Sequence, residues 1–141
     1  MNKEFCFGII PLKRKQNGWE VFLIKHNKGH WGFPKGHSLR EETPEQIACR
    51  EVFEETGLSV TNFLQVSPLT EKYIFQNENK TIDKSVTYFL AEVKGDVKLL
   101  NKEVCDSKWV FFEEALQLLT FEQSKEVCME AMKILNLPEE H

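Results

Sequence analysis

The chain has 141 residues, of which 41% are hydrophobic and 28% are charged, and its formal net charge is −4. This length and composition suit a single globular domain spanning residues 1–141 with a proper hydrophobic core. No apolar run approaches the length of about 18 residues that a membrane-spanning helix needs, so none is expected. The negative net charge argues against a stable complex with the backbone of a nucleic acid.

The expected location is the cytoplasm. Residues 1–4 do not begin a signal peptide, because an acidic residue directly follows the lysine. The cysteines show no C-x-x-C spacing and lie within apolar patterns, so they are expected to be reduced residues of the core. They are Cys6, Cys49, Cys105 and Cys128.

The first third of the chain predicts a β-hairpin followed by a loop. Residues 5–11 and 19–24 are apolar strand candidates joined by a polar turn at 13–18. Residues 25–35 contain glycine and histidine and end near Pro34, which predicts a loop.

A helix is predicted from Thr43 to Thr56. Thr43 suits the N-cap, Pro44 suits the first helical position, and Gln46 completes a capping box. Gly57 suits the left-handed conformation just past the helix end.

The remainder of the chain mixes strands with two more helices. Strands are predicted at residues 58–66, 69–75, 85–93 and 107–111, and a short helix at 113–119. The polar segment Gln76 to Asp83 is predicted to be a mobile loop. Thr120 is predicted to cap a last helix, with Gln123 in a second capping box, that ends near Asn136. This order of elements predicts one layered α/β or α+β domain.

Charge is distributed in two blocks. Residues 21–40 hold three lysines, one arginine and three of the four histidines, without any Asp or Glu, whereas residues 41–57 hold six glutamates and one arginine. A basic strip beside an acidic helix suits a polyphosphate held by side chains and metal ions, although two solvated charged faces are the simpler alternative.

The predicted helix carries three carboxylates on one face. Glu51, Glu54 and Glu55 are spaced i, i+3 and i+4, and clustered like charges destabilise a helix unless something compensates them. Hard cations with oxygen ligands, Mg²⁺ above all, are the usual compensation, with an exposed acidic face as the alternative. The opposite face is apolar and is expected to pack: it holds Ala48, Cys49, Val52 and Phe53.

With Gly36, Glu42 and Gly57-Leu58, the run Arg50–Glu55 (R-E-V-F-E-E) resembles the Nudix box with no position broken. The resemblance implies an α/β fold, an α/β/α sandwich with a mixed central sheet and the box helix on one side. It also implies hydrolysis of nucleoside diphosphates linked to another group, with Mg²⁺ or, as a substitute, Mn²⁺.

The same resemblance assigns the metal site. Glu51, Glu54 and Glu55 would gather one to three divalent ions, and Gly36 would offer its backbone carbonyl. Glu103 occupies the place of a further metal carboxylate, with a solvated loop glutamate as the alternative. Glu51, Glu54 or Glu103 would orient or deprotonate the attacking water as the catalytic group, and the sequence leaves the choice open.

Three more positions of the motif are expected to be structural. Arg50 resembles the arginine that clamps a glutamate, and Glu42 resembles the residue that braces the loop. Gly57 ends the helix.

The flanking residues are similar to asymmetrical diadenosine tetraphosphate hydrolases of the animal and archaeal type. The segment 31–37 (W-G-F-P-K-G-H) resembles their W-x-x-P-K-G-H motif, and 84–91 resembles their K-x-V-x-Y-x-L-A strand. Leu39 and Glu41 depart from the subfamily pattern, so the turn before Glu42 must differ in conformation. The resemblance to this subfamily implies phosphate contacts for His30, Lys35, His37 and Lys84.

Tyr73 and Phe121 fall where the subfamily places two aromatics that sandwich an adenine. The simpler alternatives remain: these two could be core aromatics, and His30 could be an ordinary loop histidine. Trp31 and Phe33 are expected to be packing residues, and Tyr88 could belong to core or pocket.

The expected activity is Mg²⁺-dependent hydrolysis of dinucleoside polyphosphates, diadenosine tetraphosphate to ATP and AMP above all. One alternative is a pyrophosphohydrolase acting on the 5′ end of RNA or on a modified nucleoside triphosphate. Another is a catalytically silent domain that senses a nucleotide, although a sensor has no need of three intact helix glutamates. The sequence gives no indication of oligomeric state.

Overall fold

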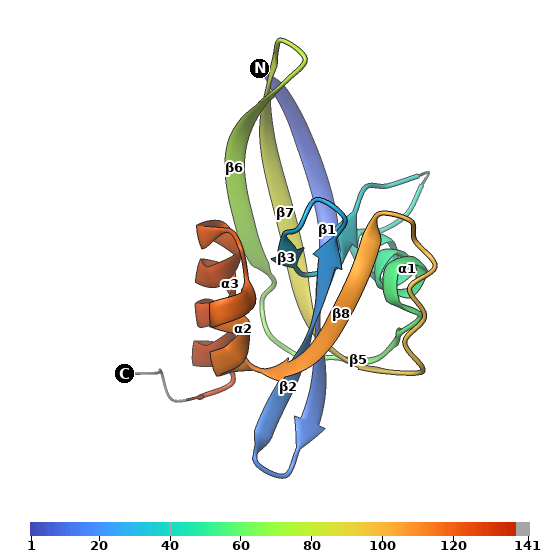
Figure 1. The fold of residues 1–141 in the computed structure, drawn as a ribbon, viewed down its shortest axis with the longest axis vertical. Helices are drawn as coiled ribbons and strands as arrows, with labels where there is room; N and C mark the ends of the chain where they lie inside the picture. The colour runs from blue at the N-terminus through green and yellow to red at the C-terminus, as the bar shows by residue number, and fades with distance from the viewer. Residues whose placement is uncertain (40, 138–141) are drawn as a thin grey trace.

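The computed structural model describes residues 1–39 and 41–137. A curved, mixed β-sheet lies between α1 on one side and α2 with α3 on the other (Figure 1). The helices are α1 (Pro44–Thr56), α2 (Phe112–Leu118) and α3 (Glu122–Ile134). The strands are β1 (Asn2–Lys15), β2 (Gly18–His26), β3 (Trp31–Gly32), β4 (Lys35–Gly36), β5 (Ser59–Phe63), β6 (Leu69–Asn77), β7 (Lys80–Lys94) and β8 (Val104–Phe111). The predicted α/β/α sandwich with the box helix on one side is confirmed.

The centre of the sheet is the parallel pair β1 and β7, whose register runs from Asn2 opposite Ile82 to Leu12 opposite Glu92. The described ladders around this pair are antiparallel: β2 and β4 pair with β1, and β5 and β6 pair with β7. The sheet order is β3-β2-β1-β7-β5, and β8 pairs with β2.

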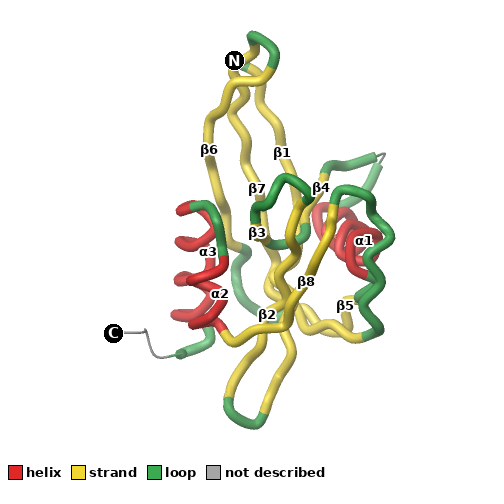
Figure 2. Tube along the Cα trace, in the orientation of Figure 1, coloured by secondary structure: helices red, strands yellow, loops and turns green. Residues whose placement is uncertain are grey.

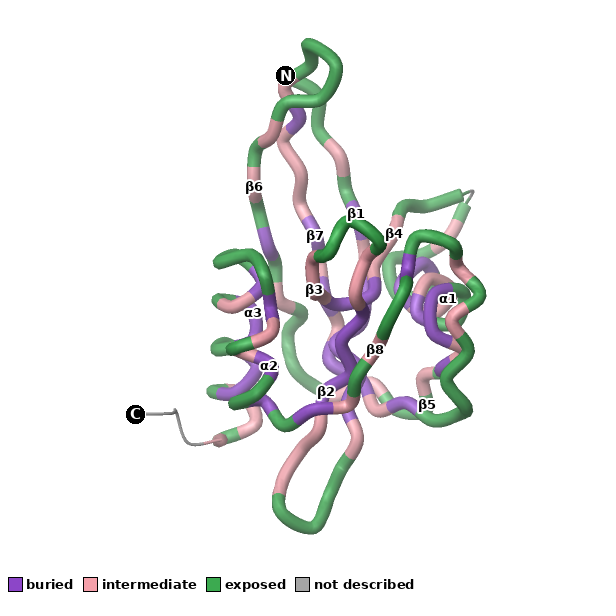
Figure 3. Tube along the Cα trace, in the orientation of Figure 1, coloured by how far each residue is buried: buried purple, intermediate pink, exposed green. Residues whose placement is uncertain are grey.

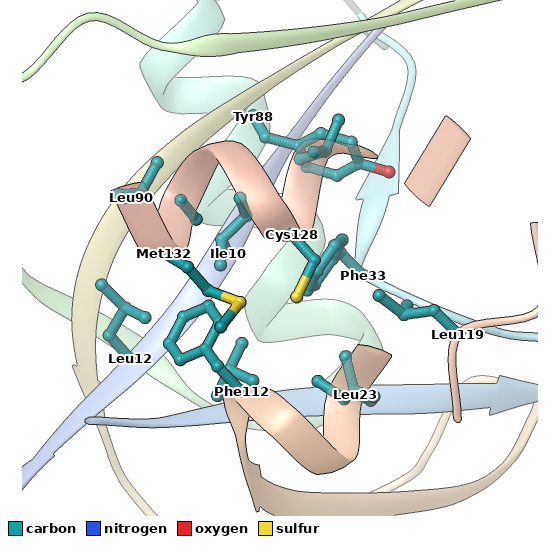
Figure 4. Close-up of a cluster of buried hydrophobic side chains, with 14 of the residues drawn as sticks. Ile10, Leu12, Leu23, Phe33, Tyr88, Leu90, Phe112, Leu119, Cys128 and Met132 are labelled. Atoms are coloured by element: carbon teal, nitrogen blue, oxygen red, sulfur yellow. The ribbon is translucent and has the colours of Figure 1, made fainter. Parts of the chain in front are cut away.

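The two faces of the sheet bury separate hydrophobic clusters, because side chains alternate along each strand. On β1, Ile9 lies in the cluster with Val52 of α1, whereas Ile10 lies in the cluster under α2 and α3. Figure 3 shows the buried positions concentrated where helices cover the sheet. Figure 4 shows the second cluster, in which Phe33 meets the ring of Tyr88 edge to face at 5.5 Å.

Residues 76–83 form a β-hairpin, so the predicted mobile loop is wrong. β6 and β7 pair without interruption from Phe75 opposite Ile82 to Asn77 opposite Lys80, and they project beyond the body of the fold (Figure 2). Only Glu78 and Asn79 turn the chain, both with positive φ (50° and 66°), as in a type I′ turn. This hairpin projects into solvent, so its strands carry polar residues and lack the apolar pattern by which strands are predicted.

The caps predicted for α1 are present. The Thr43 side chain accepts a hydrogen bond from the Gln46 backbone N–H, and Gly57 adopts φ 83°. The packing face differs from the prediction: Phe53 is 57% exposed, whereas Glu55 is buried beside Val52. The helix is therefore turned so that one carboxylate of the motif faces inward.

The predicted N-cap of the last helix is wrong. α3 begins at Glu122, after Phe121, and no side chain caps it. The hydroxyl of Thr120 instead accepts a hydrogen bond from the backbone N–H of Trp31, over 2.9 Å. A long-range contact therefore replaces the local capping bond.

All four cysteines are free thiols, and two of them, Cys6 and Cys128, are buried as predicted. Cys49 is partly buried, and Cys105 is exposed because it follows the buried Val104 on β8 and so points to the opposite face. In the described part of the chain, no helix has both the length and the hydropathy to cross a membrane.

Candidate active site

Arg50 is the centre of the carboxylate cluster on α1. Its guanidinium donates hydrogen bonds to Glu42, Glu51 and Glu54, each with a shortest distance of 2.8 Å, and to the backbone oxygen of His37, also at 2.8 Å. These bonds raise the pKa of Arg50, with Glu42 the largest contributor. One cation therefore holds three carboxylates and the preceding loop, which leaves a net negative charge on the cluster.

β4 lies directly against these glutamates. The Lys35 backbone N–H donates to Oε1 of Glu55 over 3.0 Å. A Cβ added at Gly36 would overlap the carboxyl group of Glu51, so a larger residue would displace this carboxylate from the strand. The predicted loop glycine and two helix glutamates are thus in contact.

The Glu55 side chain is buried, with Glu55 only 5% exposed, and this burial changes its pKa. Desolvation first, and then the charge of Glu51, raise the pKa of Glu55 to about 8. Burial also raises the pKa of Glu51, against the opposing effect of Arg50. Glu54 is half exposed at the rim of the cluster.

Glu103 comes from outside the box. It lies in the turn that precedes β8, where its backbone oxygen accepts a hydrogen bond from the Asn27 N–H over 2.9 Å. Its charge contributes to the raised pKa of Glu55, so the two carboxyl groups lie on the same side of the fold. Its side chain is exposed.

The oxygen atoms in this cluster are suitable ligands for a hard divalent cation. The available groups are carboxylate oxygens, which are ligands that Mg²⁺ prefers. The close approach of Gly36 and Glu51 leaves a carboxylate beside the backbone. Within residues 1–39 and 41–137, however, no three acidic, histidine or cysteine side chains already surround one point. Glu51 and Glu54 each direct an oxygen to Arg50 instead.

A cavity of about 570 Å³, which we call the α3 cavity, opens on the other face of β4. Its walls come from the segment after β2, from β6 and β7, and from the start of α3. Five residues predicted to bind substrate line it: His30, Lys35, Tyr73, Lys84 and Phe121. This volume is typical of a small-molecule site.

Lys35 joins the α3 cavity to the carboxylate cluster. Its backbone binds Glu55, whereas its side chain lines the cavity beside Lys84. Burial and then the charge of Lys84 lower the pKa of Lys35. Two cations held together at low solvent exposure are a favourable environment for a phosphate chain.

Aromatic rings form opposite parts of the cavity wall. His30 stacks on His26 with ring centroids 4.2 Å apart, and it lies 5.2 Å from the ring of Phe121. Tyr73 lies 5.8 Å from Phe75 on β6. Tyr73 is half-buried and packs against the hydrophobic cluster under α2 and α3, whereas Phe121 is half exposed.

The two stacked histidines are neutral near pH 7. Burial, followed by the neighbouring His30, lowers the pKa of His26 to about 4. Burial and then Lys35 also lower the pKa of His30. Positive charge in the α3 cavity therefore comes from the lysines.

His37 does not line the α3 cavity. Its Nε2 lies 3.3 Å from the Cys6 thiol and 3.5 Å from a carboxylate oxygen of Glu4. It lies close enough to Glu51 that its charge, when protonated, lowers the pKa of that glutamate. Among the residues predicted to bind phosphate, His37 is therefore the one outside the cavity lining.

The cavity also holds polar residues that the sequence prediction did not assign to a site, among them His26, Glu71 and Ser124. Glu71 is 5% exposed and accepts a hydrogen bond from the Ser124 hydroxyl over 2.9 Å. An acidic residue inside an alternating strand, with Tyr73 two positions further on, was the available signal. Tyr88, left open between core and pocket, belongs to both.

The chain is similar to known proteins over most of its length. A model of the NUDIX domain matches residues 3–132. The asymmetrical bis(5′-nucleosyl)-tetraphosphatase of Rattus norvegicus is 33% identical over 120 residues, covering 82% of this chain and 80% of the rat protein. The Sus scrofa enzyme of that name is 33% identical over 138 residues, covering 91% and 92%. The structure of a C. elegans Ap4A hydrolase binary complex superposes with a TM-score of 0.76 at 24% identity, covering 94% of this chain and 97% of that one, and shows a common fold.

Proposed function

Since this chain belongs to the Nudix hydrolase family, we propose that it hydrolyses dinucleoside polyphosphates, diadenosine tetraphosphate to ATP and AMP above all. The observation that carries the proposal is the position of Lys35. Its backbone binds Glu55 of the carboxylate cluster, and its side chain lines a cavity with a second lysine and aromatic rings. A substrate in which nucleosides flank a phosphate chain needs these two environments side by side.

Nudix hydrolases generally require a divalent metal, and Mg²⁺ is the proposed ion, with Mn²⁺ as a substitute. Glu51, Glu54, Glu55 and the Gly36 carbonyl would hold it, with Glu103 as a further carboxylate. When bound, the ion would neutralise phosphate oxygens and the leaving group. Arg50 and Glu42 position these carboxylates without touching substrate.

The chain's own residues account for binding and for the proton. Lys35, Lys84 and His30 would hold phosphate oxygens from the α3 cavity, and His37 would contact phosphate from the other side. Tyr73 and Phe121 would stack on adenine. A water molecule attacks one phosphorus, a P–O bond of the bridge breaks, and Glu51, Glu54 or Glu103 accepts the proton of the water.

The proposed location is the cytoplasm, which four free thiols support.

A substrate panel tests the function. It compares kcat/KM for diadenosine tetraphosphate, a 5′-triphosphorylated RNA oligonucleotide and an oxidised dGTP, each in Mg²⁺ and in EDTA. The proposal requires diadenosine tetraphosphate to be the best substrate and EDTA to stop turnover. A preference for RNA or dGTP supports a pyrophosphohydrolase, and nucleotide binding without turnover supports a sensor domain.

A further inference from the structure

Glu71 is a buried carboxyl group in the α3 cavity that the proposed hydrolysis does not use. It lies on β6 and accepts hydrogen bonds from two hydroxyl groups, that of Ser124 at 2.9 Å and that of Tyr88. A carboxylate offers about four acceptor positions, so these two donors leave acceptor capacity. Because Glu71 lines the cavity, that capacity is available to an occupant.

Two elements each deliver one ring and one polar group to this place. On β6, Glu71 and Tyr73 are two residues apart and so share one face of the strand. At the start of α3, Phe121 precedes the first turn and Ser124 lies in it, and both line the cavity. The hydrogen bond between Ser124 and Glu71 ties the two elements together. A base that stacks on these rings would therefore occupy the same cavity as the carboxyl group.

We infer that Glu71 recognises adenine by accepting a hydrogen bond from its 6-amino group. The inference rests on the proposed function in that it takes a nucleotide as the occupant of the α3 cavity. The amino group is a donor, and a carboxyl oxygen accepts from it in either protonation state. A purine without this group loses its hydrogen bond to the buried carboxyl group, which costs affinity.

The test compares ATP with purine riboside triphosphate, which lacks only the 6-amino group. Binding is measured by calorimetry in EDTA, so hydrolysis does not interfere. The wild-type protein is expected to bind ATP about tenfold more tightly. Glu71→Met removes the acceptor and should abolish this preference, whereas Glu71→Gln keeps a carbonyl acceptor in place and should retain most of it.

Equal affinity of the wild-type protein for the two nucleotides would overturn the inference. So would an unchanged preference in Glu71→Met, since that result would leave Glu71 only the structural role of joining β6 to α3. If Glu71→Met does not fold, Ser124→Ala replaces it. This variant removes the hydroxyl group that holds the Glu71 carboxyl group in position, so it should reduce the preference for ATP.

Hydrolysis of diadenosine tetraphosphate in Mg²⁺ is measured on the same wild-type preparation. Turnover without an adenine preference overturns the role of Glu71 and leaves the proposed function intact. A preference for ATP without turnover has the opposite meaning: Glu71 recognises the base, and the proposed function fails.

Discussion

The backbone N–H of Lys35 donates a hydrogen bond to the side chain of Glu55, over 3.0 Å. This bond connects the strand that bears a cavity lysine with the helix that bears the carboxylate cluster. It also explains how a glutamate that is 5% exposed can be tolerated in the fold, because a buried carboxyl group needs a donor. The same residue pair joins the proposed phosphate site to the proposed metal site.

Glu55→Gln should reduce turnover by about a hundredfold, since the loss of one electrostatic contribution near 3 kcal/mol corresponds to that factor. The amide can still accept the hydrogen bond from Lys35, so the fold should survive. The measurement is kcat in saturating Mg²⁺, with Glu45→Gln, an exposed glutamate of the same helix, as the matched control. Near-normal turnover of Glu55→Gln would show that the carboxylate does not serve a metal.

The stability of the metal-free protein should fall between about pH 6.5 and pH 8. Glu55 has a pKa of about 8 in the folded protein, against 4.5 as its ordinary value, so the folded state retains a proton that the unfolded chain has lost. The contribution of Glu55 to the free energy of unfolding is fully present below about pH 4.5 and is lost as the pH rises through about 8. His26, with a pKa of about 4, acts in the opposite direction, but only below about pH 6.5.

Thermal unfolding in EDTA across this pH range measures the effect. The decline in Tm should be smaller in Glu55→Gln, which has no proton to lose, and smaller in wild-type protein with Mg²⁺. Parallel curves for the wild type and Glu55→Gln would assign the pH dependence to other groups.

The α1 segment could be predicted from the sequence because its signals are local. Thr43, Gln46 and Gly57 fix both ends of the helix through contacts within a few residues. The spacing of the helix glutamates could likewise be read from the sequence. The burial of Glu55 could not be predicted, since it depends on how α1 packs on β1. Phe53 was therefore expected to pack, and it is exposed.

Other features depend on contacts between distant residues. Thr120 matched a capping signal, yet its hydroxyl binds the backbone of Trp31. The pairing of Glu71 with Ser124 could not be predicted, because Ser124 lies 53 positions away. The grouping of His30, Lys35, Lys84, Tyr73 and Phe121 followed from the family resemblance rather than from any spacing in the chain.

Replacing Lys35 or Lys84 by methionine should weaken binding of diadenosine tetraphosphate more than that of a diadenosine triphosphate. The longer phosphate chain carries more charge and can contact both lysines, so it loses more when one cation is removed. KM for the two substrates is the readout, and Lys80→Met, at the exposed hairpin end, is the control. An equal rise for both chain lengths would reduce the lysines to a general charge effect.

Tyr73→Ala and Phe121→Ala should each raise KM for diadenosine tetraphosphate about tenfold, because stacking is worth about 1–3 kcal/mol per base. Turnover at saturation should change less, since the rings bind the substrate and the transition state alike. If both rings contact one base, the double variant should lose less than the sum. Phe53→Ala, an exposed aromatic on α1, is the control. Much lower Tm values with unchanged KM would make these aromatics structural.

The products of diadenosine tetraphosphate hydrolysis in ¹⁸O-labelled water test the central claim most directly. With Mg²⁺ present, separation by chromatography and mass spectrometry should show ATP and AMP in equal amounts, with ¹⁸O in only one of them. This result would locate the attack at an asymmetric position of the phosphate chain. Two molecules of ADP, or no cleavage at all in Mg²⁺, would contradict the account.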